Sequence, residues 1–80
     1  MSYINQIVNV DAFYFATSFG QIKTFPRQVD FNNKKLTFNE GMQYLVQKGQ
    51  HAVRFFDMSD GEQSYRLRCE DNIWTLVGTR

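Results

Sequence analysis

The chain has a single cysteine, Cys69, in 80 residues, and this limits what can hold its fold together. One cysteine forms no disulfide within the chain and supplies no cysteine set for structural zinc, and it favours a reducing compartment. A domain of this length buries only about 60% of the surface that its unfolded chain exposes, so its net stability is small. We therefore expect one domain over residues 1–80, with a single apolar core and room for further burial through association.

The composition indicates a globular protein without a strong electrostatic field. Apolar residues make up 42% of the chain and charged residues 21%, and the formal net charge is +1. This balance argues by itself for neither a nucleic-acid surface nor a membrane-surface helix. The segment Met1–Val10 has no basic region and no long apolar run, so we expect no signal peptide, no membrane partner and a cytoplasmic location.

Short strands separated by turn residues are predicted in the first half of the chain. The aromatic run Ala12–Phe19 is typical of a strand, and Gln21–Phe25 can return beside it after a glycine turn. A further short strand is expected after Pro26, and it ends at the asparagine pair Asn32-Asn33, because asparagine tolerates a positive φ. The spacing of apolar residues before Ala12 is ambiguous, and we expect a short helical or irregular lead-in over residues 1–11.

One helix is predicted from Phe38 to Lys48. Thr37 and Glu40 stand three residues apart, as a capping box at a helix N-terminus requires. Apolar residues then fall on one stripe of the helix, namely Phe38, Met42, Leu45 and Val46. Gly41 costs about 1 kcal/mol relative to alanine inside a helix, which does not overturn the prediction.

The last third of the chain is predicted to be an antiparallel meander. His51–Met58 forms a strand, and Ser59-Asp60-Gly61 supplies a hairpin turn. Alternation of apolar and polar residues indicates the next strand around Leu67, Glu70-Asp71-Asn72 turns the chain again, and Ile73–Val77 forms the last strand. The predicted fold is therefore α+β: a small antiparallel sheet of about five strands with one central helix on one face, in the order β-β-(β)-α-β-β-β.

Aromatic residues, 16% of the chain, carry the main functional prediction. Phe13-Tyr14-Phe15 and Phe55-Phe56 place rings on both faces of a strand, because successive side chains point in opposite directions. One helix covers only one face, so the other meets loops, the N-terminal segment or another chain. We expect a non-enzymatic adaptor, inhibitor or regulator that binds a protein partner or a second copy of itself. The predicted partner-binding residues are Tyr14, Phe25, Arg54, Phe55 and Phe56.

The alternative prediction is a module for RNA or single-stranded DNA. Its binding residues would be Lys23, Arg54, Arg66 and Arg68. Cations beside aromatic rings on a sheet are a common way to hold single strands. The competing interpretation is an ordinary solvated face, on which Asp57, Glu62 and Glu70 pair with the arginines across strands.

An enzyme or a metalloprotein is not expected. His51 is the single histidine, so no histidine cluster can bind a metal. Cys69 alternates with Tyr65 and Leu67, which places its thiol on the buried face, where it stays protonated and unreactive. Five carboxylates cluster near the two C-terminal turns, where acidic residues ordinarily occur: Asp57, Asp60, Glu62, Glu70 and Asp71. We predict no catalytic residue, no cofactor and no metal.

Overall fold

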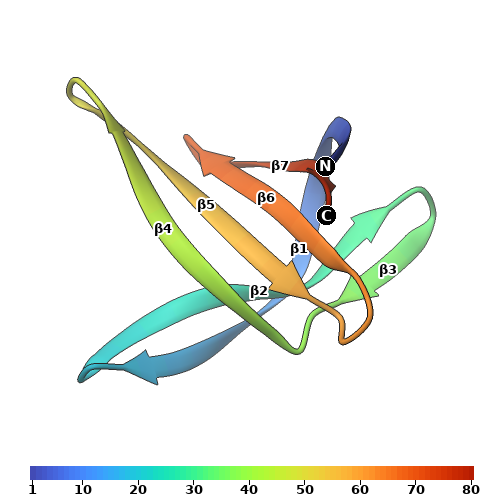
Figure 1. The fold of residues 1–80 in the computed structure, drawn as a ribbon, viewed down its shortest axis with the longest axis horizontal. Helices are drawn as coiled ribbons and strands as arrows, with labels where there is room; N and C mark the ends of the chain where they lie inside the picture. Colours follow the sequence, from blue (N-terminus) through green and yellow to red (C-terminus); the bar gives the residue numbers. More distant parts are fainter.

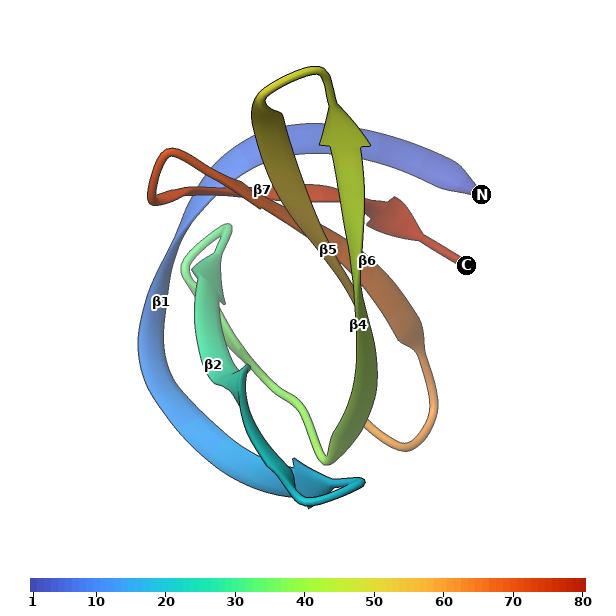
Figure 2. The same ribbon diagram turned by 90° about the vertical axis from the view of Figure 1, so that its left-hand side faces the viewer.

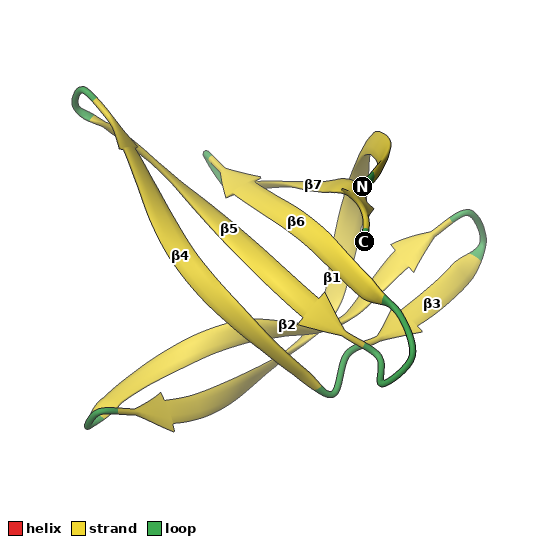
Figure 3. Ribbon diagram, in the orientation of Figure 1, coloured by secondary structure: helices red, strands yellow, loops and turns green.

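The structure is a computed structural model that describes residues 1–80, except for the side chain of Ser18. Every regular element in this described chain is a β-strand (Figures 1 and 3). The strands are β1 (Ser2–Ser18), β2 (Gln21–Phe31), β3 (Lys34–Thr37), β4 (Glu40–Lys48), β5 (His51–Ser59), β6 (Ser64–Glu70) and β7 (Ile73–Thr79). The predicted α+β class is therefore wrong, and the protein is all-β. Within the described residues no helix has the length and apolar character needed to cross a membrane.

The seven strands form one antiparallel sheet in the order β3-β2-β1-β7-β6-β5-β4. Strand β1 lies between β2 and β7, and its first half pairs with β7 while its second half pairs with β2. The sheet curls into a half-barrel, so that its two ends come to face each other (Figure 2). Consecutive strands β3 and β4 are therefore the two edge strands, and the chain crosses from one edge to the other between them.

The N-terminal segment is a strand, so the predicted helical or irregular lead-in over residues 1–11 is wrong. A helix would place Ile4, Ile7 and Val8 on one face. In the structure Ile4 and Val8 pack on the core, while Ile7 is exposed to 69%. The pairing of β1 with β7 is interrupted between Tyr3 and Gln6, where Asn5 has a φ of 52°. Such a β-bulge disturbs the alternation that would otherwise mark the strand.

The core lies on the concave inner face of the curled sheet. Its buried side chains come from five strands and from the link between β3 and β4: Val8, Phe25, Val29, Phe38, Phe56, Met58, Leu67 and Leu76. The predicted strands of the last third lie where β5, β6 and β7 are observed. The turn residues Asn32, Asn33, Asp71 and Asn72 all have a positive φ, between 50° and 63°. These short polar residues suit tight hairpin turns, and both turns fall where they were predicted.

The predicted helix from Phe38 to Lys48 is wrong, because Glu40–Lys48 is strand β4 and pairs with β5 along its whole length. Thr37 is the last residue of β3 rather than a helix cap. Its hydroxyl oxygen accepts a hydrogen bond from the Gln28 side-chain amide at 3.2 Å. Phe38 is buried in the link that follows, and its N–H donates to the Arg27 carbonyl oxygen at 2.7 Å.

The apolar residues of β4 fit two periods at once, which explains this error. Met42, Leu45 and Val46 suit a helical stripe, whereas Met42, Tyr44 and Val46 alternate along one face of a strand. The pattern therefore does not choose between the two structures. The nine-residue ladder decides for the strand, because alternate residues of β4 exchange backbone hydrogen bonds with β5 and Gly41 is spared the cost it would have in a helix.

Two further register shifts bend β1, between Val10 and Ala12 and between Ala12 and Phe13. Beyond them β1 pairs with β2 alone, because β7 reaches only Val8 of β1 and β3 reaches only Gln28 of β2. Residues 13–18 of β1 and 21–26 of β2 thus form a two-stranded arm that projects from the rest of the sheet (Figure 1). The arm is the part of the fold that positions the candidate site.

Candidate interaction surfaces

The outer face of the arm carries exposed aromatic and aliphatic side chains. Phe13 and Phe15 are exposed to 49% and 72%, and they alternate with Tyr14 and Ala16, which pack on the core. Ile22, exposed to 74%, pairs with Thr17 and therefore lies diagonally beside Phe15 on the same face. We call Phe13, Phe15, Phe19 and Ile22 the arm patch.

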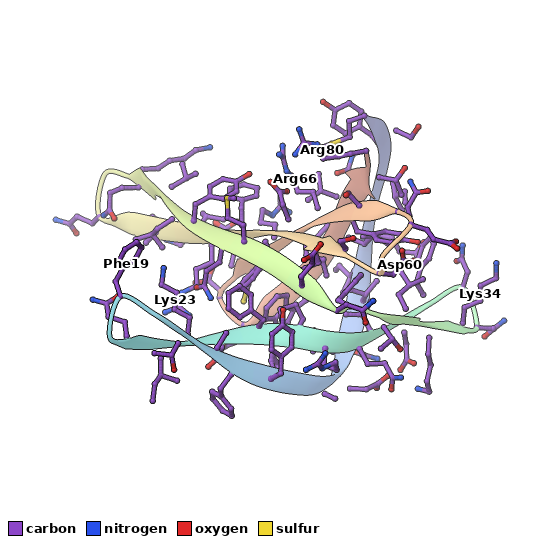
Figure 4. All side chains as sticks on the ribbon, turned by 60° about the horizontal axis from the view of Figure 1, so that its bottom comes forward. Phe19, Lys23, Lys34, Asp60, Arg66 and Arg80 are labelled. Atoms are coloured by element: carbon purple, nitrogen blue, oxygen red, sulfur yellow. The ribbon has the colours of Figure 1, made fainter. Side chains whose placement is uncertain are left out.

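Phe19 completes the arm patch at the turn of the hairpin. It is fully exposed, and its φ of 50° lies in the left-handed region that a bulky residue seldom occupies. Figure 4 shows Phe19 at the tip of the arm, at the opposite end of the molecule from Lys34. A ring held in water on a strained turn is unfavourable for an isolated protein, which marks this tip as a candidate contact.

The arm and the β4–β5 hairpin diverge towards their turns (Figure 1), and a groove lies between them. The groove holds about 540 Å³ and is lined by Gln21–Thr24 of β2, Gln43–Leu45 of β4 and Arg54 of β5. Near the base of the arm, the Gln43 side-chain amide donates to the Thr24 carbonyl oxygen at 2.9 Å. The charged lining residues are Lys23 and Arg54, both cations, so an anionic ligand would be favoured here.

The five predicted partner-binding residues do not form one surface. Phe25 and Phe56 are buried in the core, exposed to only 7% and 2%, and their ring centroids are 6.3 Å apart. Tyr14 stacks on Phe25 at 5.3 Å on the inner face. Arg54 lines the groove. Phe55 lies on the outer face, where its ring stacks on Tyr44 at 5.6 Å. The exposed phenylalanine rings are instead Phe13, Phe15 and Phe19 of the arm patch, while Tyr3 and Tyr44 are exposed elsewhere on the sheet.

The four predicted nucleic-acid residues are divided between the two faces of the sheet. Lys23 and Arg54 line the groove, whereas Arg66 and Arg68 lie on the outer face. Arg66 binds Asp57 through two hydrogen bonds of 2.8 and 3.2 Å, and this contact raises the pKa of the Arg66 guanidinium. The Arg68 Nε atom is buried without a hydrogen-bond partner among the described side chains. The proposed strip of three strand arginines is thus interrupted, and a pair of cations remains at the groove.

Two residues that were considered as catalytic candidates, Cys69 and Asp60, have environments that keep each in its ordinary protonation state. Burial raises the pKa of the Cys69 thiol, which keeps it protonated near neutral pH. The Asp60 carboxylate accepts hydrogen bonds from the N–H groups of Gln63 and Glu62 in the β5–β6 turn. These bonds lower the pKa of Asp60, because they favour its charged form. Both groups therefore serve the fold in this arrangement.

One group of side chains could hold a cation, and the sequence did not reveal it. His51 Nε2 lies 2.6 Å from a carboxylate oxygen of Glu70, and ligand atoms of His51, Glu70 and Asp71 all lie within 4.8 Å of one another. His51 begins β5 and Glu70 ends β6, so only the pairing of these strands brings them together. The three residues sit at the solvent-facing end of the sheet, where a hydrogen bond between His51 and Glu70 accounts for the contact without a metal.

Sequence reasoning also missed Phe19, Ile22 and the edge strand β4. The sequence predicted a helix on one face of the sheet, and the structure has no helix to cover the outer face of the arm. Period-2 alternation in Met42–Val46 was the available signal for β4. Comparison of the chain with models of protein families, with curated proteins and with solved structures finds no match.

Proposed function

We propose that this protein is a non-enzymatic interaction module that binds a partner protein through the arm patch. The observation that carries the proposal is the exposure of four large apolar side chains on one hairpin, from 49% at Phe13 to full exposure at Phe19. Clustered apolar side chains in water mark interaction sites in small soluble domains. Aromatic residues are also the ones that most often dominate binding energy at protein interfaces.

The partner should present an apolar protein surface rather than a charged polymer. The outer rows of the arm hold Phe13, Phe15 and Thr17 on β1 and Ile22 and Thr24 on β2, none of which is charged. Lys23, the cation of the arm, alternates with Ile22 and Thr24 and so faces the groove. A nucleic acid needs cations close to its phosphates, and this face offers none among its described side chains.

A non-enzymatic role agrees with the surroundings of the candidate catalytic groups. The Cys69 thiol has a raised pKa, and the Asp60 carboxylate is held by backbone N–H groups in a turn. We place the activity in the cytoplasm, because an unpaired cysteine suits a reducing compartment.

The double substitution Phe15→Ser with Ile22→Ser is expected to abolish partner binding while leaving the fold intact. Both side chains are largely exposed, so the free energy of unfolding should change by no more than about 0.5 kcal/mol per site. Immobilised protein would be incubated with an extract of the source cells, and the retained proteins compared by quantitative mass spectrometry. Binding of the leading protein, once purified, would then be measured by calorimetry.

The matched control is Ile7→Ser, which removes a side chain of similar exposure, 69%, from the part of β1 outside the arm. A partner of the arm patch should form a stoichiometric complex with the wild type and with the control. It should bind the double variant at least about 10-fold more weakly. Equal binding of one partner to all three proteins would contradict the proposal.

The groove supports a second candidate function, the binding of RNA or single-stranded DNA. Lys23 and Arg54 approach one channel with no carboxylate in its lining, and Tyr44 of β4 is among the residues that border it, although its ring stacks on Phe55. Cations along a groove with an adjacent ring are what a single strand requires. This candidate is second because two cations provide a small charge for a polyanion.

If the groove binds single strands, a fluorescent pool of random oligonucleotides should bind at low salt, and its affinity should fall steeply as salt rises. Lys23→Glu with Arg54→Glu should remove this binding, measured by fluorescence anisotropy. Lys34→Glu reverses a charge at the far end of the molecule and serves as the control (Figure 4). No binding by the wild type at low salt, or equal loss with the control, would eliminate this candidate.

A further inference from the structure

Strand β4 is an edge strand that lacks the usual protection against pairing. It pairs with β5 on one side only, and no described strand pairs with its other edge, although the Gln43 side chain reaches the Thr24 carbonyl oxygen of β2 across the groove. Edge strands are usually blunted by a central lysine, a proline or a bulge. The middle of β4 has none of these, and its Met42, Tyr44 and Leu45 side chains are exposed to 65%, 38% and 58%. This edge has the features of a strand that pairs with another chain.

The charges of β4 show which chain fits. Glu40 begins the strand and Lys48 ends it, and both are exposed. Neither makes an ion pair with any described side chain. When two copies of β4 pair antiparallel with Tyr44 opposite Tyr44, each Glu40 stands opposite a Lys48 of the other copy. Opposite charges placed directly across an antiparallel pair are stabilising, and the two-fold symmetry produces this contact twice.

The same register matches the apolar side chains. Met42 comes to lie opposite Val46 of the other copy on the outer face, and Gln43 lies opposite Leu45 on the inner face. The Tyr44 rings meet at the two-fold axis, and each already stacks on Phe55 at 5.6 Å. The pairing therefore extends one aromatic pair on each protomer into a continuous row of four rings across the sheet.

From these observations we propose that two copies of this chain associate through β4 into one continuous antiparallel sheet. A second copy fits better than an unrelated extended peptide, because β4 complements itself in both charge and apolar pattern. The arrangement also adds burial to a chain too short to bury much by itself. Phe13 and Phe15 of the arm patch lie on a different hairpin from β4, so dimerisation leaves these two rings free for a partner, whereas Ile22 lies closer to the added strand because it lines the groove beside β4.

The test is a charge exchange measured by sedimentation over a series of concentrations at low salt. Glu40→Lys alone and Lys48→Glu alone each replace two attractive pairs in the dimer by two repulsive ones. Each should weaken dimerisation by about 10-fold or more. The double variant Glu40→Lys with Lys48→Glu restores opposite charges at both contacts and should return the dissociation constant to within about threefold of the wild type.

Glu62→Lys changes the net charge equally in an exposed turn away from β4, and it should leave dimerisation unchanged. Circular dichroism of every variant confirms that the sheet is intact. A wild type that stays monomeric at several hundred micromolar overturns the proposal, and so does a double variant as weak as the single ones. Association that is lost with Phe15→Ser and Ile22→Ser, but not with the charge variants, would assign self-association to the arm patch and also overturns it.

Discussion

Replacing Phe38 with alanine is expected to remove about 3–5 kcal/mol from the free energy of unfolding. Phe38 is fully buried, and it is the one large core side chain supplied by the link between the two edge strands. Its ring packs 5.6 Å from the ring of Tyr65, while its N–H bonds the Arg27 carbonyl oxygen on the opposite side of the curl. Truncation would leave a cavity between the two ends of the sheet.

The loss would consume much of the stability of such a small protein, which is about 4–12 kcal/mol for a chain of this length. Phe38→Leu should lower the free energy of unfolding by less than Phe38→Ala does. The leucine variant therefore gives a measurable comparison if the alanine variant does not fold. Phe19→Ala removes the same side chain from a fully exposed position and should change stability by less than about 0.5 kcal/mol. Chemical denaturation followed by Trp74 fluorescence measures all three, and equal effects of Phe38→Ala and Phe19→Ala would contradict the structure.

The second large effect is expected at Gly78, where alanine should destabilise the protein by about 1–3 kcal/mol. Gly78 is buried in β7 and pairs with Tyr3 of β1 and Arg66 of β6. A Cβ atom at this position would press against the backbone carbonyl oxygen of Ser2. Backbone atoms in a ladder cannot move aside alone, so β1 would have to shift away from β7.

Gly41→Ala provides the matched comparison for Gly78→Ala. A Cβ atom at Gly41 would meet the sulfur end of the buried Met58 side chain, which is unbranched and flexible, and would lie 3.1 Å from the Asp57 carbonyl oxygen. Its cost should therefore be smaller than that of Gly78→Ala. Thermal unfolding measures both variants, and amide exchange in β1 should increase only in Gly78→Ala. A larger loss of stability for Gly41→Ala than for Gly78→Ala would contradict the prediction that the contact between β1 and β7 is the tighter of the two.

Local signals predicted the parts of the fold that depend on neighbouring residues. The asparagine and aspartate turns at Asn32-Asn33 and Asp71-Asn72 were predicted from side chains that tolerate positive φ, and the structure has them there. The alternation in β6, with Leu67 buried, was likewise readable along the chain. The burial of Phe25 and Phe56 could not be predicted in this way. A run of aromatic residues shows that rings lie on both faces of a strand, but it does not show which face packs in the core.

From the residues alone one could predict a single small domain, the turns at Gly20, Asn32-Asn33, 59–61 and 70–72, and the strands between the C-terminal turns, since these depend on residues a few positions apart. That Glu40–Lys48 is a strand, that the start of β1 joins β7, and that the arm stands open follow from contacts between distant segments. Glu40–Lys48 and residues 1–11 carry apolar spacings compatible with either helix or strand. The backbone hydrogen bonds of a strand are made to residues elsewhere in the chain. Whether such a segment forms a strand therefore depends on which other strand lies beside it in the folded protein.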